Sequence, residues 1–178
     1  MNNLSRPAPV RQALSIDSKM CAYQVGDEDN RPWGHYVVTG VGIAANGEGY
    51  CKKVITIKPW QVLSLQSHKL RREKWTVKRG TLTALRDGQR FELSPHEFVH
   101  IPVGSIHCMA NMDEDGCVVE EVQEGICHEE DIKRYMDIYR RGTETLVSPE
   151  ATESFTAYRS ILIDINKIRM NRMQGAPY

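Results

Sequence analysis

The sequence has no surplus of charge of either sign. Its 178 residues carry 23 lysine and arginine residues against 23 aspartate and glutamate residues, so the formal net charge at pH 7 is zero. A balanced surface creates no long-range field that would attract nucleic acid or an anionic membrane. We therefore expect neither a nucleic-acid partner nor a membrane partner.

Long apolar segments and paired cysteines are also missing. No apolar run approaches the roughly 20 residues that a membrane span needs. The first residues are polar, with Pro7 and Pro9 and without the apolar core of a signal peptide. The 5 cysteines are widely spaced, with no Cys-x-x-Cys pair, which fits reduced thiols in a cytoplasm better than a disulfide framework. The length predicts one domain with a hydrophobic core.

The chain does contain a series of short segments rich in β-branched residues, separated by turn residues. We expect strands at 36–39, 51–59, 62–68, 73–78, 81–85, 91–93, 98–102, 106–110 and 117–123. Asp87-Gly88 is a strong hairpin signal between two of them. Short strands at regular spacing predict an all-β fold, a closed barrel or jelly roll.

The regions on either side of this barrel differ from it in composition and in the secondary structure that they predict. Residues 1–30 are polar and predict an N-terminal arm with a weak helical stretch at 10–21, residues 31–125 form the barrel, and residues 126–178 form a helical extension. Acids at 129–131 favour a helix that runs to Tyr139, and Ser148 and Pro149 are typical of the start of a second helix. An apolar stripe on that helix contains Tyr158, Ile161, Leu162, Ile165 and Ile168. The stripe packs on the barrel or on a second copy of the chain, so a homodimer stays open.

Four nitrogen and oxygen donors occur at positions where a barrel could bring them together. Gln66 and His68 are two residues apart, so both side chains leave the same face of a strand. Glu73 follows a short polar run, and His107 comes from a distant segment. Such a set suits one divalent transition metal ion.

Lys53 shares a strand face with Ile55 and Ile57. If the isoleucines face the core, the lysine points inward with them, where its ammonium needs a partner. The alternative is a lysine near the strand end that extends to water.

Two segments match the motifs of the cupin family. Gln66-x-His68, Glu73 and Gly80 match the first motif, with glutamine in place of its first histidine. Pro102-x-Gly104-x-x-His107-x-x-x-Asn111 matches the second.

A closer resemblance is to the type II phosphomannose isomerase domain. It rests on Arg31-Pro32-Trp33-Gly34-x-Tyr36, Lys53, Leu63-Ser64-Leu65-Gln66-x-His68-x-x-Arg71-x-Glu73-x-Trp75-x-Val77, Ile101-Pro102, Glu121-Val122-x-x-Gly125 and Glu129-Glu130-Asp131-x-x-Arg134-Tyr135-x-Asp137-x-Tyr139. The resemblance covers about residues 31 to 141. The sequence shows no match to the nucleotidyltransferase segment of the bifunctional enzymes that carry this domain.

The resemblance implies a cupin jelly-roll barrel that interconverts mannose 6-phosphate and fructose 6-phosphate through an enediol. It implies Gln66, His68, Glu73 and His107 as ligands of one divalent metal ion. Zinc is the default for this donor set, and manganese, cobalt, nickel and iron stay open.

Other residues are candidates for contact with a phosphorylated sugar. Lys53 is a candidate for catalysis or substrate contact, and Glu121 for the base, although both faces of its strand carry apolar residues. Arg134 and Arg31 are candidates for binding phosphate. The alternatives are that Arg134 pairs with Glu130 on a helix and that Arg31 lies on the surface.

The sequence also departs from the family pattern. Lys69 and Leu70 replace residues that are usually histidine or polar, Trp60 replaces a glycine of the first motif, and His96 replaces the glycine or asparagine that opens the second. Two other functions stay open: a different cupin enzyme, such as a dioxygenase or another sugar isomerase, and a non-catalytic cupin that binds a sugar or a metal.

Overall fold

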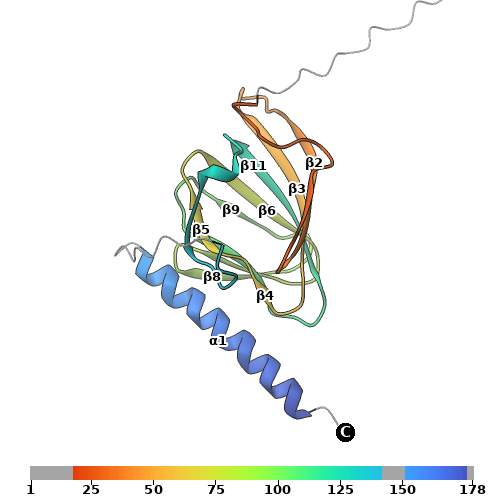
Figure 1. Cartoon of the computed structure of the whole chain (residues 1–178), viewed down its shortest axis with the longest axis vertical. Helices are drawn as coiled ribbons and strands as arrows, with labels where there is room; N and C mark the ends of the chain where they lie inside the picture. The colour runs from red at the N-terminus through yellow and green to blue at the C-terminus, as the bar shows by residue number, and fades with distance from the viewer. Residues whose placement is uncertain (1–17, 142–150, 176–178) are drawn as a thin grey trace, which may run out of the picture.

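Two antiparallel β-sheets face each other and close into a barrel (Figure 1). The computed structural model describes residues 18–141 and 151–175. The first sheet contains, in spatial order, β1 (Glu28–Arg31), β2 (Gly34–Ile43), β3 (Gly49–Ile57), β11 (Cys117–Gly125), β6 (Arg71–Arg79) and β9 (Phe98–Ile101). The second contains β12 (Ile132–Met136), β5 (Leu65–His68), β10 (His107–Asn111), β7 (Leu82–Arg86) and β8 (Gln89–Leu93), and the short β4 (Gln61–Val62) pairs with β10. The predicted all-β architecture is confirmed.

The inner face of the first sheet changes character along its strands. Buried and partly buried residues alternate along β3, β6 and β11, as expected for strands with one face inward. At one end the inward residues are apolar, and Ile57, Trp75 and Val119 belong to the main core. At the other end they are polar, and Lys53, Glu73 and Glu121 are buried there. The barrel therefore has an apolar floor and a polar mouth.

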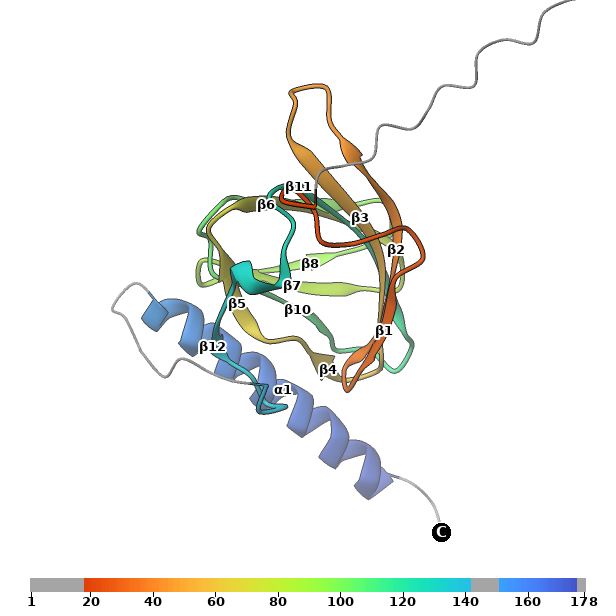
Figure 2. The ribbon, with the colours of Figure 1, turned by 45° about the horizontal axis from the view of Figure 1, so that its top comes forward.

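One long helix, α1 (Thr152–Gly175), lies against the outside of the second sheet (Figures 1 and 2). Tyr158, Ile161 and Ile165 of the expected apolar stripe are buried against the sheet, and Leu162 and Ile168 are partly buried. A second core thus lies between the sheet and the helix. Helix α1 lacks the sustained hydropathy of a bilayer-spanning helix. The predicted helix start at Ser148 and Pro149 lies outside the described residues.

The expected helix from residue 129 to Tyr139 is wrong. Glu129–Asp131 form a single 3-10 turn, η1, and the chain then continues as strand β12. Strand β12 pairs with β5, with Ile132 opposite His68 and Arg134 opposite Gln66. The exposed backbone edge of β5 accepts this strand, and that pairing outweighs the local preference of an acidic turn for helix.

The N-terminal part of the chain is described from residue 18 onward. The stretch at 10–21 lies mostly outside the described residues, and Cys21 forms a parallel β-bridge with Cys127. The acidic residues that follow form β1, which pairs with β2 and places Glu28 opposite Val37. How the chain divides into units stays a prediction.

Candidate metal centre and cavity

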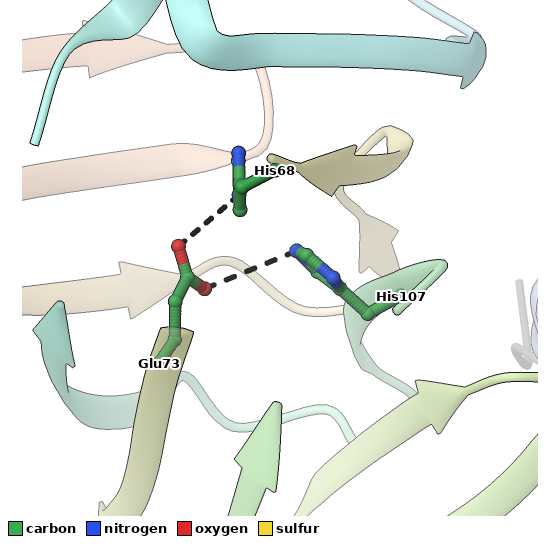
Figure 3. A group of neighbouring side chains, drawn as sticks. All are labelled: His68, Glu73 and His107. Carbon is green, nitrogen blue, oxygen red and sulfur yellow. Dashed lines mark ion pairs between the residues drawn. The ribbon is translucent and has the colours of Figure 1, made fainter. Parts of the chain in front are cut away.

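His68, Glu73 and His107 meet inside the polar end of the barrel (Figure 3). They come from the end of β5, from β6 and from the start of β10. His68 Nε2 lies 3.1 Å from Glu73 Oε1, and His107 Nε2 lies 3.9 Å from Glu73 Oε2. All three side chains are buried, and their ligand atoms lie within 4.8 Å of one another. This spacing suits donors that share one ion.

The ring of His107 is oriented to offer a lone pair. Its Nδ1 lies 2.9 Å from the carbonyl oxygen of Ser105, so Nδ1 carries the proton and donates it there. Nε2 is then unprotonated, buried, and without a hydrogen-bond partner among the described residues. Burial lowers the pKa of His107 to about 4, although Glu73 opposes the shift. A neutral imidazole with an unshared lone pair fits a metal ligand.

Glu73 is the anionic member of the cluster. Burial raises its pKa, but the interaction with His68, which includes a hydrogen bond, and the charge of Arg71 outweigh burial and hold that pKa well below its ordinary value. Trp75 Nε1 donates a hydrogen bond of 2.9 Å to Oε2, and Arg71 Nε donates one of 3.2 Å to Oε1. These donors fix the carboxylate and leave it ionised, which a divalent cation requires.

Gln66, the fourth predicted ligand, lies beside the cluster. Its backbone pairs with that of His107 across β5 and β10, so both side chains occupy the same face. The amide oxygen of Gln66 accepts a hydrogen bond of 2.8 Å from the hydroxyl of Ser64. The structure therefore brings three of the four predicted donors into contact and places the fourth next to them. Its role as a ligand stays a prediction.

A cavity opens above this cluster at the mouth of the barrel. Its empty space, counted together with the solvent at its open mouth, is about 550 Å³. Its polar lining consists of Arg31, Lys53, Ser64, Gln66, Arg71, Glu121, Gln123, Glu129, Arg134 and Arg141. Five cationic side chains against two carboxylates give the cavity a positive balance. The two histidines and Glu73 do not line the cavity themselves, but Arg71 contacts His68 and Gln123 contacts Glu73.

Lys53 and Glu121 face each other across β3 and β11. Lys53 is only 6% exposed, and its ammonium lies 3.6 Å from the centre of the Tyr23 ring. The structure thus points Lys53 into the barrel. A buried ammonium needs a partner, and the face of the Tyr23 ring is that partner.

The carboxyl group of Glu121 also points inward, which resolves the ambiguity of its strand. Burial, with Glu73 nearby, raises the pKa of Glu121 to about 8, while Lys53 and Arg71 oppose the shift. Gln123 Nε2 donates a hydrogen bond of 2.9 Å to Glu121. A carboxyl group whose pKa lies near neutrality can both accept and return a proton.

The two predicted phosphate-binding arginines both line the cavity. Arg31 pairs with Asp29 at 2.8 Å and is partly exposed. Arg134 pairs with Glu129 at 3.0 Å. The expected pairing partner on a helix was Glu130, and the strand conformation of β12 removes that geometry.

Five polar residues of the cavity lining were not predicted as site residues from the sequence: Ser64, Arg71, Gln123, Glu129 and Arg141. Arg71 contacts both Glu73 and His68, Gln123 links Glu73 to Glu121, and Arg141 lines the rim. Parity along β11 could have found Gln123, because it shares a face with Glu121. No sequence pattern identified Arg141 as a cavity residue, because the segment before it was expected to be a helix outside the barrel.

The replacements at Lys69 and Leu70 lie away from this cavity. Both side chains are exposed, and neither residue lines it. Their backbone amides donate to the carboxylate of Asp131, each at 3.0 Å. This departure from the family pattern therefore leaves the cavity lining unchanged.

The comparisons with known proteins agree on the family. Residues 19–137 match the family described as "Mannose-6-phosphate isomerase C-terminal". The chain is 36% identical over 120 residues to a mannose-1-phosphate guanylyltransferase of Escherichia coli K12, covering 67% of this chain and 24% of that protein. It is 37% identical over 115 residues to the alginate biosynthesis protein AlgA of Pseudomonas aeruginosa, covering 64% of this chain and 23% of that protein. The chain thus spans about a quarter of the length of these relatives.

Solved structures show the same fold at low sequence identity. The capsular polysaccharide assembling protein CapF of Staphylococcus aureus superposes with a TM-score of 0.51 at 18% identity, over 62% of this chain and 31% of that chain. An RmlC-like cupin of Shewanella frigidimarina gives 0.50 at 12% identity, over 59% and 87%. The predicted cupin fold is confirmed. With the matched residues and the barrel that they form, the chain belongs to the family of mannose-6-phosphate isomerase C-terminal domains and is a cupin of the sugar-phosphate isomerase type.

Proposed function

We propose that the protein is a metal-dependent isomerase that interconverts mannose 6-phosphate and fructose 6-phosphate. The observation that carries the proposal is one cavity in which Lys53 and Glu121 face each other beneath a rim of arginines. An acid–base pair beside an anion-binding rim is what proton transfer on a sugar phosphate requires. The family match supports the same reaction.

The reaction moves one proton between neighbouring carbons. Removing the proton from C2 of mannose 6-phosphate, while the aldehyde oxygen O1 gains a proton, gives the cis-enediol. Returning a proton to C1, while the hydroxyl on C2 loses its proton, gives fructose 6-phosphate. We assign the transfers at carbon to Glu121, because its pKa of about 8 makes both protonation states accessible near neutral pH.

The cations of the cavity have separate tasks in this scheme. Lys53 lies beside Glu121 and donates to the sugar oxygens that gain negative charge. Arg134 and Arg31 bind the phosphate, since a guanidinium is always charged and offers parallel donors to two phosphate oxygens.

The metal ion is held by His68, Glu73 and His107, with Gln66 as the fourth ligand. Zinc fits two imidazoles and one carboxylate best, while manganese, cobalt, nickel and iron accept the same donors. A bound divalent ion would supply positive charge that stabilises an oxyanion. We also keep the homodimer as a proposal, with the exposed outer face of α1 as the surface through which two copies would pack.

The test compares neighbouring residues on the two faces of the same strands. Metal-loaded protein is assayed for conversion of mannose 6-phosphate to fructose 6-phosphate. Lys53→Met and Glu121→Gln should each lower kcat by about 10²- to 10⁴-fold. Lys52→Met and Glu120→Gln alter an ion pair of 3.7 Å between partly exposed groups and should leave kcat unchanged.

The other functions predict different outcomes of the same assay. Binding of a sugar phosphate without turnover would indicate a non-catalytic cupin. Oxygen consumption with iron-loaded protein and substrate would indicate a dioxygenase. Absence of turnover with every hexose and pentose phosphate would contradict the proposal.

A further inference from the structure

Residues 18–27 form a strap that crosses the barrel near its mouth (Figure 2). One anchor is the bridge to Cys127, in which Ala22 N donates to the Cys127 carbonyl at 3.1 Å and Cys127 N donates to the Met20 carbonyl at 2.8 Å. The other is β2, where Gly26 N donates to the Val38 carbonyl at 2.9 Å. Tyr23 lies between these anchors, so the strap fixes the position of its side chain.

The ring of Tyr23 covers Lys53, one of the three cations assigned to the substrate. Lys53 Nζ lies 3.6 Å from the centre of that ring and 5.0 Å from the centre of the Tyr36 ring. An ammonium over an aromatic face is attracted to it, most strongly where water is excluded. Tyr23 itself does not line the cavity, so it contacts the lysine from behind.

The hydroxyl of Tyr23 is linked to Arg134, a second of these cations, through the carboxylate of Glu129. It donates a hydrogen bond of 3.0 Å to Glu129 Oε2, while Glu129 Oε1 accepts one of 3.0 Å from an Arg134 terminal nitrogen. Burial raises the pKa of Glu129, but the Tyr23 hydrogen bond and the charges of Lys53 and Arg134 lower it below its ordinary value. Arg134 Nε is buried and has no hydrogen-bond partner among the described residues.

These contacts give the tyrosine hydroxyl a specific effect on the arginine. A carboxylate with both oxygens free binds a guanidinium through two parallel hydrogen bonds. In the structure Tyr23 donates to Oε2 and Arg134 contacts Glu129 through Oε1 alone, and the guanidinium makes no other hydrogen bond to the described residues.

We propose that Tyr23 is a positioning residue that holds Lys53 with its ring and, through Glu129, keeps Arg134 available to bind a phosphate monoester. This inference rests on the proposed function for the identity of the substrate. It assigns a role to a part of the chain in which the sequence showed no chemistry.

The test uses inorganic phosphate as the probe, with metal-loaded full-length protein and titration calorimetry. Tyr23→Phe keeps the ring and removes the hydroxyl, so the Kd for phosphate and the KM for mannose 6-phosphate should both rise by about tenfold. The kcat should change by less than about twofold, because Lys53 keeps its aromatic partner. Adding Glu129→Gln to Tyr23→Phe should restore phosphate affinity, since a neutral amide no longer competes as an anion for Arg134.

Tyr23→Leu removes both contacts and should also lower kcat. It should increase the rate at which acetic anhydride modifies Lys53, measured by peptide mass spectrometry, whereas Tyr23→Phe should not. Tyr50→Phe, in the β2–β3 hairpin and outside the cavity lining, is the matched control and should change none of these quantities.

The outcomes separate this inference from the proposed function. Normal isomerase kinetics and phosphate affinity in both Tyr23 variants would overturn the positioning role and leave the isomerase intact. Phosphate binding that weakens in Tyr23→Phe and recovers with Glu129→Gln, in a protein without isomerase activity, would support the positioning role and overturn the isomerase. A weakened affinity that Glu129→Gln does not restore would show that the hydroxyl acts in some other way, against the inference.

Discussion

Trp60 and His96 have backbone φ angles of 54° and 75°, in the left-handed region that favours glycine. These are two positions at which the chain departs from the glycine pattern of the cupin motifs. The backbone has kept the turns that glycine normally makes, and each side chain adds strain. The Trp60 side chain has a compensating contact, because the Arg172 guanidinium lies 5.1 Å from the centre of its ring. His96 is exposed, so its side chain brings no burial in return.

We therefore expect His96→Gly to stabilise the protein by about 0.5–1 kcal/mol. The turn persists in the variant, since the backbone hydrogen bond from His96 N to the Val77 carbonyl at 2.9 Å needs no side chain. Urea denaturation measures the change as a shift of the midpoint at constant slope. Trp60→Gly is the matched comparison and should destabilise, because the packed indole is lost. A lower midpoint for His96→Gly would show that the histidine side chain has a favourable contact.

At the scale of elements, strands with an alternating pattern of apolar residues were predictable from the sequence. A strand that forms only because a neighbouring strand edge is available was not. The inward polar residues of β3 and β11 follow from parity, once the neighbouring isoleucines and valines define the inner face. Strand β12 gave no such signal, because its acidic start and the basic residues at 140 and 141 are those of a helix. Only the free edge of β5, a tertiary feature, makes it a strand.

The same limit applies to the candidate site. The cupin motifs predicted His68, Glu73 and His107, because motif spacing encodes where the strands bring these side chains. Tyr23 reaches Lys53 because its segment is anchored at the bridge between Cys21 and Cys127, which are far apart in the sequence, and at β2. No local pattern encodes a contact of this kind. Residues brought in by non-periodic segments therefore need the structure.

Helix α1 depends on one deeply buried aromatic side chain. Tyr158 is fully buried between the helix and the second sheet, and its hydroxyl donates a hydrogen bond of 3.1 Å to the Leu63 carbonyl. Tyr158→Ala should lower the free energy of unfolding by about 3–5 kcal/mol, because it leaves a large cavity. Ile163 lies on the outer face of the same helix and is 53% exposed, so Ile163→Ala should change the free energy of unfolding by less than about 0.5 kcal/mol. Equal effects of the two variants in urea denaturation would show that the helix does not dock on the barrel in solution.

At the scale of the whole molecule, the candidate metal centre joins the two sheets. Glu73 belongs to β6 of the first sheet, whereas His68 and His107 belong to β5 and β10 of the second. A bound ion would therefore connect the two layers of the barrel at its polar end. Apolar packing at this end is limited to a small cluster of Cys21, Val38, Cys51 and Cys127 and is less extensive than at the floor, so the ion should matter for stability as well as for the reaction.

Zinc should raise the melting temperature of metal-free protein in a concentration-dependent way. A ligand that binds only the folded state adds about 2.7 kcal/mol at one hundred times its Kd. For a chain of this size that corresponds to roughly 5–10 °C. His107→Ala should abolish the response, whatever its own starting temperature, while His100→Ala removes an exposed histidine and should keep it. Since the readout is thermal unfolding, it does not depend on the substrate. A melting temperature that zinc leaves unchanged in the wild-type protein would mean that the buried lone pair of His107 is not a zinc ligand.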